Sequence, residues 1–402
     1  MTVTIKKSTA KGTITAPPSK SVSHRALICA AFSNGCTVSN VAYSDDVNAT
    51  LNCLEALGAT VERKENSVFL GNLNPENFKE NTVLDCFESG STLRFMLPIC
   101  LLGDKKITLT GTKRLFERPL DVFEEMCDKK GLFYEKNENS VTVCGPLNAG
   151  EYAVRGDVSS QFITGLLLAL AFLKDDSTLT ILGDAQSRPY MDITIGILKD
   201  FGIDIKVSGN SFYIKGSQSF KTDDYFIEGD CSNAAFLDSF NLLGGEVLVE
   251  GINPDTTQGD YVYKQIFSDL KNGKKQFDLS DCPDLAPILF SLAAYLGGAT
   301  FTGTHRLKIK ESNRALAMQE ELKKFGINTK VYDNEVIIEG AILKEPTEIL
   351  YSHNDHRIAM ALSVLCSVTG GTISRAEAVN KSYPNFFKDL DKLKIGLDFN
   401  ET

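Results

Sequence analysis

The stretch from Lys308 to Phe325, KIKESNRALAMQEELKKF, places charged side chains next to a helical pattern. Lys310, Glu311 and Arg314 lie close together, and the apolar residues after them recur with the spacing of a helix. The start of a helix with cations beside it can hold an anion, because free backbone N–H groups and positive side chains converge there. The acid among these cations is either a structural counter-ion or a group that transfers a proton.

Polar clusters also mark the starts of other predicted helices. A single serine or arginine at such a place is most often a cap or a solvated charge. Here they recur before helix bodies that are almost purely apolar, and they comprise Lys20, Ser21, Arg25, Gly90, Arg118, Ser159, Ser160, Gln161, Ser187, Asp284, Arg357 and Lys381. Arginines can bind carboxylates and phosphates through two parallel hydrogen bonds. Taken together, the clusters indicate a site for small, multiply charged anions.

Two of these positions, and a pair of histidines, have a structural and a functional reading. Asp284, in DCPDLAPILFSLAAYL, either caps a helix or acts as a general base. Gly90 either eases a turn or lets a substrate approach the backbone. His353 and His356 have a spacing that a metal can use, but Asp355 between them is better interpreted as a helix cap. We therefore expect no metal site there.

The elements that must position these residues form an internal repeat. In each unit an apolar helix ends in a turn, and a β-rich run, a polar loop, a second helix and a closing strand or hairpin follow. A glycine just past the second helix, at Gly58, Gly131, Gly202 and Gly326, fits a left-handed cap, and residues 209–210 and 333–334 have the chemistry of tight hairpin turns. Junctions such as FSNGCTVSNV, LLGDKKITLTG and YLGGATFTG recur roughly every 70 residues, a longer period than in solenoid repeats. Six units predict two α/β domains of three units each, with mixed sheets backed by helices. The polar segment 223–233 is interpreted as a crossover between them.

Composition limits the possible classes of protein. The chain has 402 residues, more than one ordinary core holds, and a net charge of −10, which disfavours nucleic-acid binding. No segment has the features of a signal core or a membrane span. The ten cysteines form no CxxC pair, so we expect reduced core thiols in a cytoplasmic protein. No GxxxxGK[ST] or GxGxxG motif indicates a nucleotide cofactor.

A series of ordered motifs then points to a known family. PSKSVSHR, ESGSTLR, ERPLD, VSSQF, SRPYMDI, CPDLAP, KIKESNR, NDHRIAMA and KSYPNFF closely resemble those of the 5-enolpyruvylshikimate-3-phosphate (EPSP) synthase family. The resemblance implies a two-domain, inside-out α/β barrel of six βαβαββ repeats. We expect one domain at 1–16 and 229–402, an inserted domain at 17–228, and the active site in the cleft between them.

The resemblance also implies an activity and roles for individual residues. The reaction is transfer of the enolpyruvyl group of phosphoenolpyruvate to the 5-hydroxyl of shikimate 3-phosphate, with release of phosphate, in aromatic amino-acid biosynthesis. Shikimate 3-phosphate is expected at Lys20, Ser21, Arg25, Ser159, Ser160, Gln161, Ser187, Asp284 and Lys310. Phosphoenolpyruvate is expected at Lys20, Gly90, Arg118, Gln161, Arg314, Arg357 and Lys381.

Asp284 and Glu311 are the expected proton-transfer pair. Whether Lys20 or Glu311 delivers the proton to the methylene carbon stays open. The family needs no metal or organic cofactor. We expect no nucleic-acid or membrane partner, a monomer, and glyphosate as a possible inhibitor.

The chain departs from the family pattern at two places. Glu88 and Ser89 stand where many members carry NAG, and Arg306 stands where several members have asparagine. We expect these differences to change inhibitor sensitivity or local contacts and to leave the reaction unchanged.

Three other functions compete with this one. An enolpyruvyl transferase acting on UDP-N-acetylglucosamine typically has a reactive cysteine in the loop that corresponds to 111–119, and GTKRLFERP has none. A non-catalytic anion-binding repeat protein would need the arginines but not Asp284 and Glu311. RNA-end processing on a similar architecture is disfavoured by the acidic charge balance.

Overall fold

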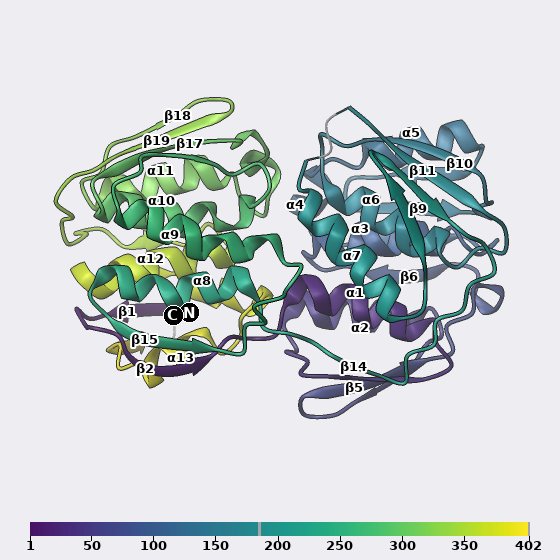
Figure 1. The fold of residues 1–402 in the computed structure, drawn as a ribbon, viewed down its shortest axis with the longest axis horizontal. Coiled ribbons are helices and arrows are strands. Elements are labelled where there is room, and N and C mark those ends of the chain that lie inside the picture. The colour runs from purple at the N-terminus through teal and green to yellow at the C-terminus, as the bar shows by residue number, and fades with distance from the viewer. Residues whose placement is uncertain (184–185, 401–402) are drawn as a thin grey trace. The chain divides into compact units, whose positions relative to one another are not determined.

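The computed structural model describes residues 1–183 and 186–400, which form two compact units (Figure 1). One unit is discontinuous and comprises Met1–Pro17 and Gly229–Thr402; the other, Pro18–Glu228, is inserted into it. The sequence had placed the boundaries after residues 16 and 228. The two connections between the units run side by side. The backbone N–H of Asp230 donates to the carbonyl of Pro17, and the backbone N–H of Ser19 donates to the carbonyl of Glu228.

The inserted unit contains three sheets of four strands each. Their strand orders are β14-β3-β5-β4, β6-β7-β9-β8 and β10-β11-β13-β12. In each sheet the first pair is parallel and the other pairs are antiparallel. The strands are β3 (Cys36–Ser39), β4 (Thr60–Arg63), β5 (Ser67–Gly71), β6 (Thr82–Asp85), β7 (Ile107–Thr110), β8 (Phe133–Lys136), β9 (Ser140–Cys144), β10 (Glu151–Arg155), β11 (Ser177–Leu182), β12 (Ile205–Ser208), β13 (Ser211–Ile214) and β14 (Asp224–Phe226).

The helices of this unit pack against its sheets (Figure 1), and some of them, such as the helix at 121–130, leave one face exposed. They are α1 (Lys20–Ala31), α2 (Asp45–Ala56), α3 (Gly90–Cys100), α4 (Lys113–Glu117), α5 (Asp121–Lys130), α6 (Ser160–Leu170) and α7 (Arg188–Asp200). The first helix of each repeat, α1, α3 or α6, is buried along almost its whole length. The body of this helix is apolar because it is buried in the core, so its polar side chains lie at its start. A serine caps each of these three starts: Ser19, Ser89 and Ser159.

The discontinuous unit has the same plan with one reduced sheet. Two sheets have four strands, in the orders β16-β17-β19-β18 and β20-β21-β1-β22, and the third pairs only β15 with β2. Its strands are β1 (Thr2–Ile5), β2 (Lys11–Thr15), β15 (Glu246–Glu250), β16 (Gln276–Asp278), β17 (Gly298–Thr302), β18 (Thr329–Val331), β19 (Glu335–Glu339), β20 (Leu350–Tyr351), β21 (Gly371–Ser374) and β22 (Leu397–Asn400). Strand β1 lies between β21 and β22, so the beginning of the chain completes the last repeat.

The helices of the discontinuous unit again pack against its sheets (Figure 1), and some of them, such as the helix at 263–271, leave one face exposed. They are α8 (Cys231–Asp238), α9 (Tyr263–Lys271), α10 (Ala286–Tyr295), α11 (Arg314–Lys324), α12 (His356–Thr369) and α13 (Phe386–Lys392). Short 3₁₀ helices connect or precede these helices. In the discontinuous unit they are η2 (Ser239–Leu243), η3 (Gly259–Val262), η4 (Pro283–Leu285), η5 (His305–Ile309) and η6 (Ala376–Lys381). The inserted unit contains η1 (Pro75–Asn77).

Local turn predictions are confirmed. The glycines after the second helices have positive φ, as left-handed caps require, at Gly58, Gly131, Gly202 and Gly326. The tight turns predicted at 209–210 and 333–334 lie between paired strands. The segment 223–233 was predicted as a crossover loop. The chain does pass from one unit to the other within it, after Glu228. The segment also contains β14, which pairs with β3, and the start of α8.

All ten cysteines are free thiols, and all except Cys144 are buried. This agrees with their prediction as core residues. None of the helices within residues 1–183 and 186–400 combines the length and apolar character that a bilayer span needs.

Candidate active site

Asp284 lies in η4, and three cations surround its carboxylate. Its Oδ1 accepts hydrogen bonds from Nζ of Lys310 at 3.1 Å and from Nη1 of Arg314 at 2.9 Å. Its Oδ2 accepts from Nη2 of Arg357 at 3.0 Å. Helix α10 begins at Ala286 with no side-chain cap. The carboxylate thus binds three cations, which favours the functional reading of Asp284 over the helix-cap reading.

Arg314 connects this carboxylate to two more acids. Its Nη2 donates to Oε2 of Glu311 at 2.8 Å, and its Nε donates to Oδ2 of Asp355 at 2.9 Å. The side chain is only 1% exposed. Burial opposes the charge, but Asp355, Glu311 and Asp284 raise the pKa of Arg314 above its usual value. The arginine therefore stays a cation in the core of the cluster.

Lys310 and Lys381 are the two lysines among the predicted site residues of the discontinuous unit. Burial lowers the pKa of Lys310, although Asp284 opposes the shift. Lys381 is buried at the end of η6, and its Nζ donates to the carbonyl oxygen of Asn354. That oxygen belongs to the turn before α12, so Lys381 is tied to the same segment that carries Asp355.

Helix α12 presents Arg357 from its first turn. Asp355 caps this helix, as predicted, because its Oδ1 accepts from the backbone N–H of Arg357 at 2.9 Å. Nη2 of Arg357 also donates to Oγ of Ser232 at 3.0 Å. The predicted residues Asp284, Lys310, Glu311, Arg314 and Arg357 thus form one network of ion pairs and hydrogen bonds, and Lys381 joins it through the turn.

The inserted unit has its own cluster, which begins at the first turn of α1. Nζ of Lys20 pairs with Oδ2 of Asp46 on α2 at 2.8 Å. Ser19 caps α1, and the carbonyl oxygen of Ser21 accepts from Nη1 of Arg25 at 2.7 Å. The first two turns of α1 therefore hold both predicted cations in place.

Arg25 is buried and is held by neutral oxygens. Its Nε donates to Oγ1 of Thr194 at 2.7 Å, and its Nη2 donates to Oγ1 of Thr164 and to the carbonyl of Tyr190. The guanidinium also lies 5.0 Å above the ring of Phe95. Burial lowers the pKa of Arg25 to about 10, which still leaves it charged near neutral pH. None of these oxygens carries a negative charge, so they orient the cation without neutralising it.

Gly90 opens α3 directly against an arginine. A Cβ atom at this position would lie 2.5 Å from Nη1 of Arg118 and 2.8 Å from its Cζ. Arg118 itself is buried. The sequence offered a turn or a close substrate approach as the reason for this glycine. The structure gives a third reason, since only glycine leaves room for the guanidinium.

Gln161 is fixed at the start of α6 by two contacts to α3. Its Oε1 accepts from Nη1 of Arg94 at 3.0 Å, and its Nε2 donates to Oγ of Ser91 at 3.0 Å. Nη2 of Arg94 donates to the carbonyl of Pro119, just after Arg118. Arg94 therefore links the start of α6 to the segment that carries Arg118.

The predicted serines lie at the ends of neighbouring helices. Ser159 caps α6, where its Oγ accepts from the backbone of Gln161, and Ser160 is buried in the first turn. Ser187 precedes α7 with a φ of 56° and is buried. Helices α1, α6 and α7 pack together within the inserted unit. The predicted serines, with Lys20 and Gln161, are thus carried by the starts of helices that pack together.

Some residues of these networks were not assigned roles from the sequence. Asp46 and Ser232 hold predicted cations, and Arg94 holds Gln161. Asp355 was predicted only as a helix cap, and its contact with Arg314 was not predicted. An arginine inside the apolar run of α3 was a visible signal, but its partner lies in another repeat. Arg306, one of the two departures from the family pattern, is buried and donates to the carbonyl of Ser280.

One group of side chains in the described residues has the spacing of a metal site. Ligand atoms of Glu320, Glu321 and His353 lie within 4.8 Å of one another. Nζ of Lys324 bonds both carboxylate oxygens of Glu321 at 3.0 Å. The carboxylate of Glu321 is therefore already paired with a cationic side chain. The group does not include His356, which the sequence analysis had considered together with His353.

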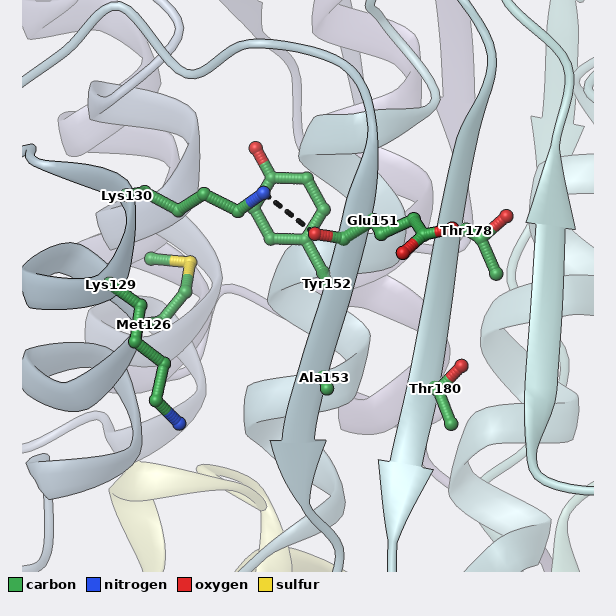
Figure 2. A pocket seen from close by; sticks show the side chains of 8 residues that line it. All are labelled: Met126, Lys129, Lys130, Glu151, Tyr152, Ala153, Thr178 and Thr180. Carbon is green, nitrogen blue, oxygen red and sulfur yellow. Dashed lines mark hydrogen bonds between the residues drawn. The ribbon is translucent and has the colours of Figure 1, made fainter.

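A pocket of about 540 Å³ lies between α5 and the sheet of β10 and β11 (Figure 2). Nζ of Lys130 donates to the carbonyl of Glu151 and lies 4.2 Å from the ring centre of Tyr152. In Figure 2, Lys129 extends away from this contact. None of the residues lining the pocket belongs to either cluster of predicted site residues.

Comparison with known proteins gives a consistent family. The family model for EPSP synthase (3-phosphoshikimate 1-carboxyvinyltransferase) matches residues 5–390. A 3-phosphoshikimate 1-carboxyvinyltransferase of Clostridium novyi is 39% identical, with 95% of each chain covered. The protein of the same name from Clostridium acetobutylicum is 40% identical, also with 95% of each chain covered.

Solved structures match over the full length. An EPSP synthase from Acinetobacter baumannii has a TM-score of 0.78 at 24% identity, covering 99% of this chain and 100% of its own. The enolpyruvyl transferase NikO from Streptomyces tendae has a TM-score of 0.78 at 15% identity, covering 100% and 99%. At such identities the matches bear on the fold, and they confirm the predicted inside-out α/β architecture.

Proposed function

The chain belongs to the EPSP synthase family, and we propose that its two clusters of charged residues serve the single reaction of that family. The enzyme transfers the enolpyruvyl group of phosphoenolpyruvate to the 5-hydroxyl of shikimate 3-phosphate and releases phosphate. Both substrates are anions that repel one another in water. A set of fixed cations offsets this repulsion and orients the reacting groups.

Shikimate 3-phosphate binds mainly to the inserted unit in this proposal. Its ligands there are Lys20, Ser21, Arg25, Ser159, Ser160, Gln161 and Ser187, with Asp284 and Lys310 from the other unit. Support comes from Arg25, whose contacts to Thr194, Thr164 and Tyr190 orient the guanidinium and leave its charge uncancelled. Hydroxyl and amide groups at the start of α6 can bind phosphate or sugar-like oxygens beside that cation.

Phosphoenolpyruvate draws on cations of both units. Arg314, Arg357 and Lys381 come from the discontinuous unit, and Lys20, Gly90, Arg118 and Gln161 come from the inserted unit. The fit of Arg118 against Gly90 supports this assignment, because it holds a buried guanidinium at a helix start.

Asp284 removes the proton from the 5-hydroxyl as its oxygen bonds to C2 of phosphoenolpyruvate, and Glu311 or Lys20 supplies the proton that adds to the methylene carbon. Loss of a proton from the resulting methyl group then restores the C=C bond as the C–O bond to phosphate breaks and phosphate leaves. Asp284 bonds Lys310, Arg314 and Arg357. A carboxylate with three cationic partners is a weak base, so these cations must turn towards the substrate anions for the carboxylate to accept a proton. Substrate binding would thereby activate the base. This exchange of partners is the central step of the proposed mechanism, and the three contacts of Asp284 are the observation that supports it.

We further propose a cytoplasmic monomer that glyphosate inhibits by competing for the phosphoenolpyruvate cations. UDP-N-acetylglucosamine is the main alternative acceptor, because related transferases use the same fold. The loop at 111–119 lacks the cysteine typical of those enzymes.

The function is tested by phosphate release with both substrates, with each alone, and with UDP-N-acetylglucosamine in place of shikimate 3-phosphate. We expect release only with the shikimate 3-phosphate and phosphoenolpyruvate pair. Turnover with the nucleotide sugar would overturn the choice of acceptor.

A further inference from the structure

Glu321, in the last turns of α11, is a fully buried carboxylate outside the proposed ligand set. Its side chain is 0% exposed. Oε1 accepts from Nζ of Lys324 and from Nε2 of His353, each at 3.0 Å. Oε2 accepts from the backbone N–H of Tyr351 at 3.0 Å. Burial opposes its ionisation, but the hydrogen bonds from His353, Tyr351 and Lys324 lower the pKa of Glu321. It therefore acts as a charged acceptor.

Two partners of Glu321 lie at the turn between β20 and α12: Tyr351 ends β20, and His353 is in the turn itself. His353 and Asn354 in this turn both have a φ of 53°. Two consecutive residues other than glycine in the left-handed region are strained, and such strain persists only where the surroundings hold it. Glu321 holds the turn from one side through Tyr351 and His353. Oγ of Ser352 anchors it to the carbonyl of Arg375 on the other.

The same turn places three groups of the candidate active site. The carbonyl of Asn354 accepts from Lys381, and the next residue, Asp355, pairs with Arg314. Asp355 also caps the helix from which Arg357 extends. A small displacement of the turn would therefore move Lys381, Asp355 and Arg357 together.

Helix α11 contacts this segment at two points. At its start Arg314 bonds Asp355, and two turns later Glu321 bonds Tyr351 and His353. We propose that Glu321 is a positioning residue, which fixes the strained turn so that Arg357 and Lys381 are held ready for phosphoenolpyruvate. This inference rests on the proposed function, because it assigns those two cations to that substrate.

The test compares Glu321→Gln with Glu320→Gln. Both variants remove one negative charge from adjacent positions of the same helix, but Glu320 is exposed. We expect Glu321→Gln to raise the Michaelis constant for phosphoenolpyruvate on the order of tenfold to a hundredfold, as misplaced binding groups do. The constant for shikimate 3-phosphate should change far less, because most of its proposed ligands lie in the other unit. Glu320→Gln should behave as wild type.

A second pair of variants tests the contact from the turn. His353→Gln keeps an N–H donor near the position of Nε2, whereas His353→Leu does not. We expect Gln to preserve the Michaelis constant for phosphoenolpyruvate more closely than Leu. Equal effects of the two substitutions would contradict the proposal, as would equal increases of both Michaelis constants in Glu321→Gln.

Amide hydrogen exchange over 351–357 gives a readout that does not depend on activity. Exchange should be faster in Glu321→Gln than in Glu320→Gln, since an anchor of the turn is weakened. Unchanged exchange in a folded Glu321→Gln would overturn the inference. If exchange rises while wild type shows no phosphate release, the anchoring role of Glu321 stands and the proposed function fails.

Discussion

Arg357 donates to Asp284 at 3.0 Å, although the two residues lie 73 positions apart in the chain. Each comes from the start of a helix, and each helix belongs to a different repeat. The contact places a candidate base directly beside a candidate substrate-binding cation. An anion that binds Arg357 would compete with this contact and so change the reactivity of Asp284.

Replacing Asp284 by alanine should reduce the rate of phosphate release by roughly 10²–10⁴-fold, the range for a positioned acid or base. Anion binding should persist, because Lys310, Arg314 and Arg357 remain. Turnover numbers and equilibrium binding of phosphoenolpyruvate check this expectation. Asp284→Asn is the matched control for shape, and it should be equally slow. Wild-type turnover in either variant would exclude Asp284 from proton transfer.

Gly90→Ala should weaken phosphoenolpyruvate binding with little loss of stability. The new methyl group would overlap the end of the Arg118 side chain, and a flexible guanidinium moves more easily than backbone. We expect a higher Michaelis constant for phosphoenolpyruvate and an almost unchanged melting temperature. In an Arg118→Ala background the overlap is gone, so adding Gly90→Ala should have little further effect. A large further increase in that background would show that the clash is elsewhere.

His24 should make the protein less stable as the pH falls below neutrality. The ring is fully buried, and its Nδ1 lies 2.7 Å from Oγ1 of Thr50. Burial, with Lys20 and Arg25 nearby, lowers the pKa of His24 well below 6.5. The unfolded chain therefore binds the proton first, so this contribution is present above pH 6.5 and is lost as the pH falls towards the folded pKa.

The slope of the unfolding free energy with pH measures this effect. It should reach at most about 1.4 kcal/mol per pH unit from this one group. In His24→Asn the amide can still bond Thr50 but does not titrate, so the slope below pH 6.5 should be smaller. An identical slope in the variant and the wild type would assign the pH dependence to other groups.

Features encoded by neighbouring residues could be predicted from the sequence. The cap Asp355, the glycine at 326 and the turn at 333–334 all depend on a few adjacent positions. The apolar face formed by Met318 and Leu322 is buried, as helical spacing indicated. The repeated layout followed from the same local patterns.

Contacts between helices could not be predicted in this way. The pairing of Lys20 with Asp46 and of Arg94 with Gln161 depends on how helices pack, which spacing alone does not specify. The two-stranded sheet of the discontinuous unit could not be predicted for a similar reason. Strand β1 joins the last repeat and β2 pairs with β15, so the first strands of the chain complete sheets formed by distant segments.

The central claim is that cations from both units bind the same substrate. The most direct measurement is the Michaelis constant for phosphoenolpyruvate in Arg118→Lys, from the inserted unit, and Arg357→Lys, from the discontinuous unit. A lysine keeps the charge but cannot form two parallel hydrogen bonds, so we predict that the constant rises in both variants. A rise in one variant with a wild-type value in the other would contradict a shared site.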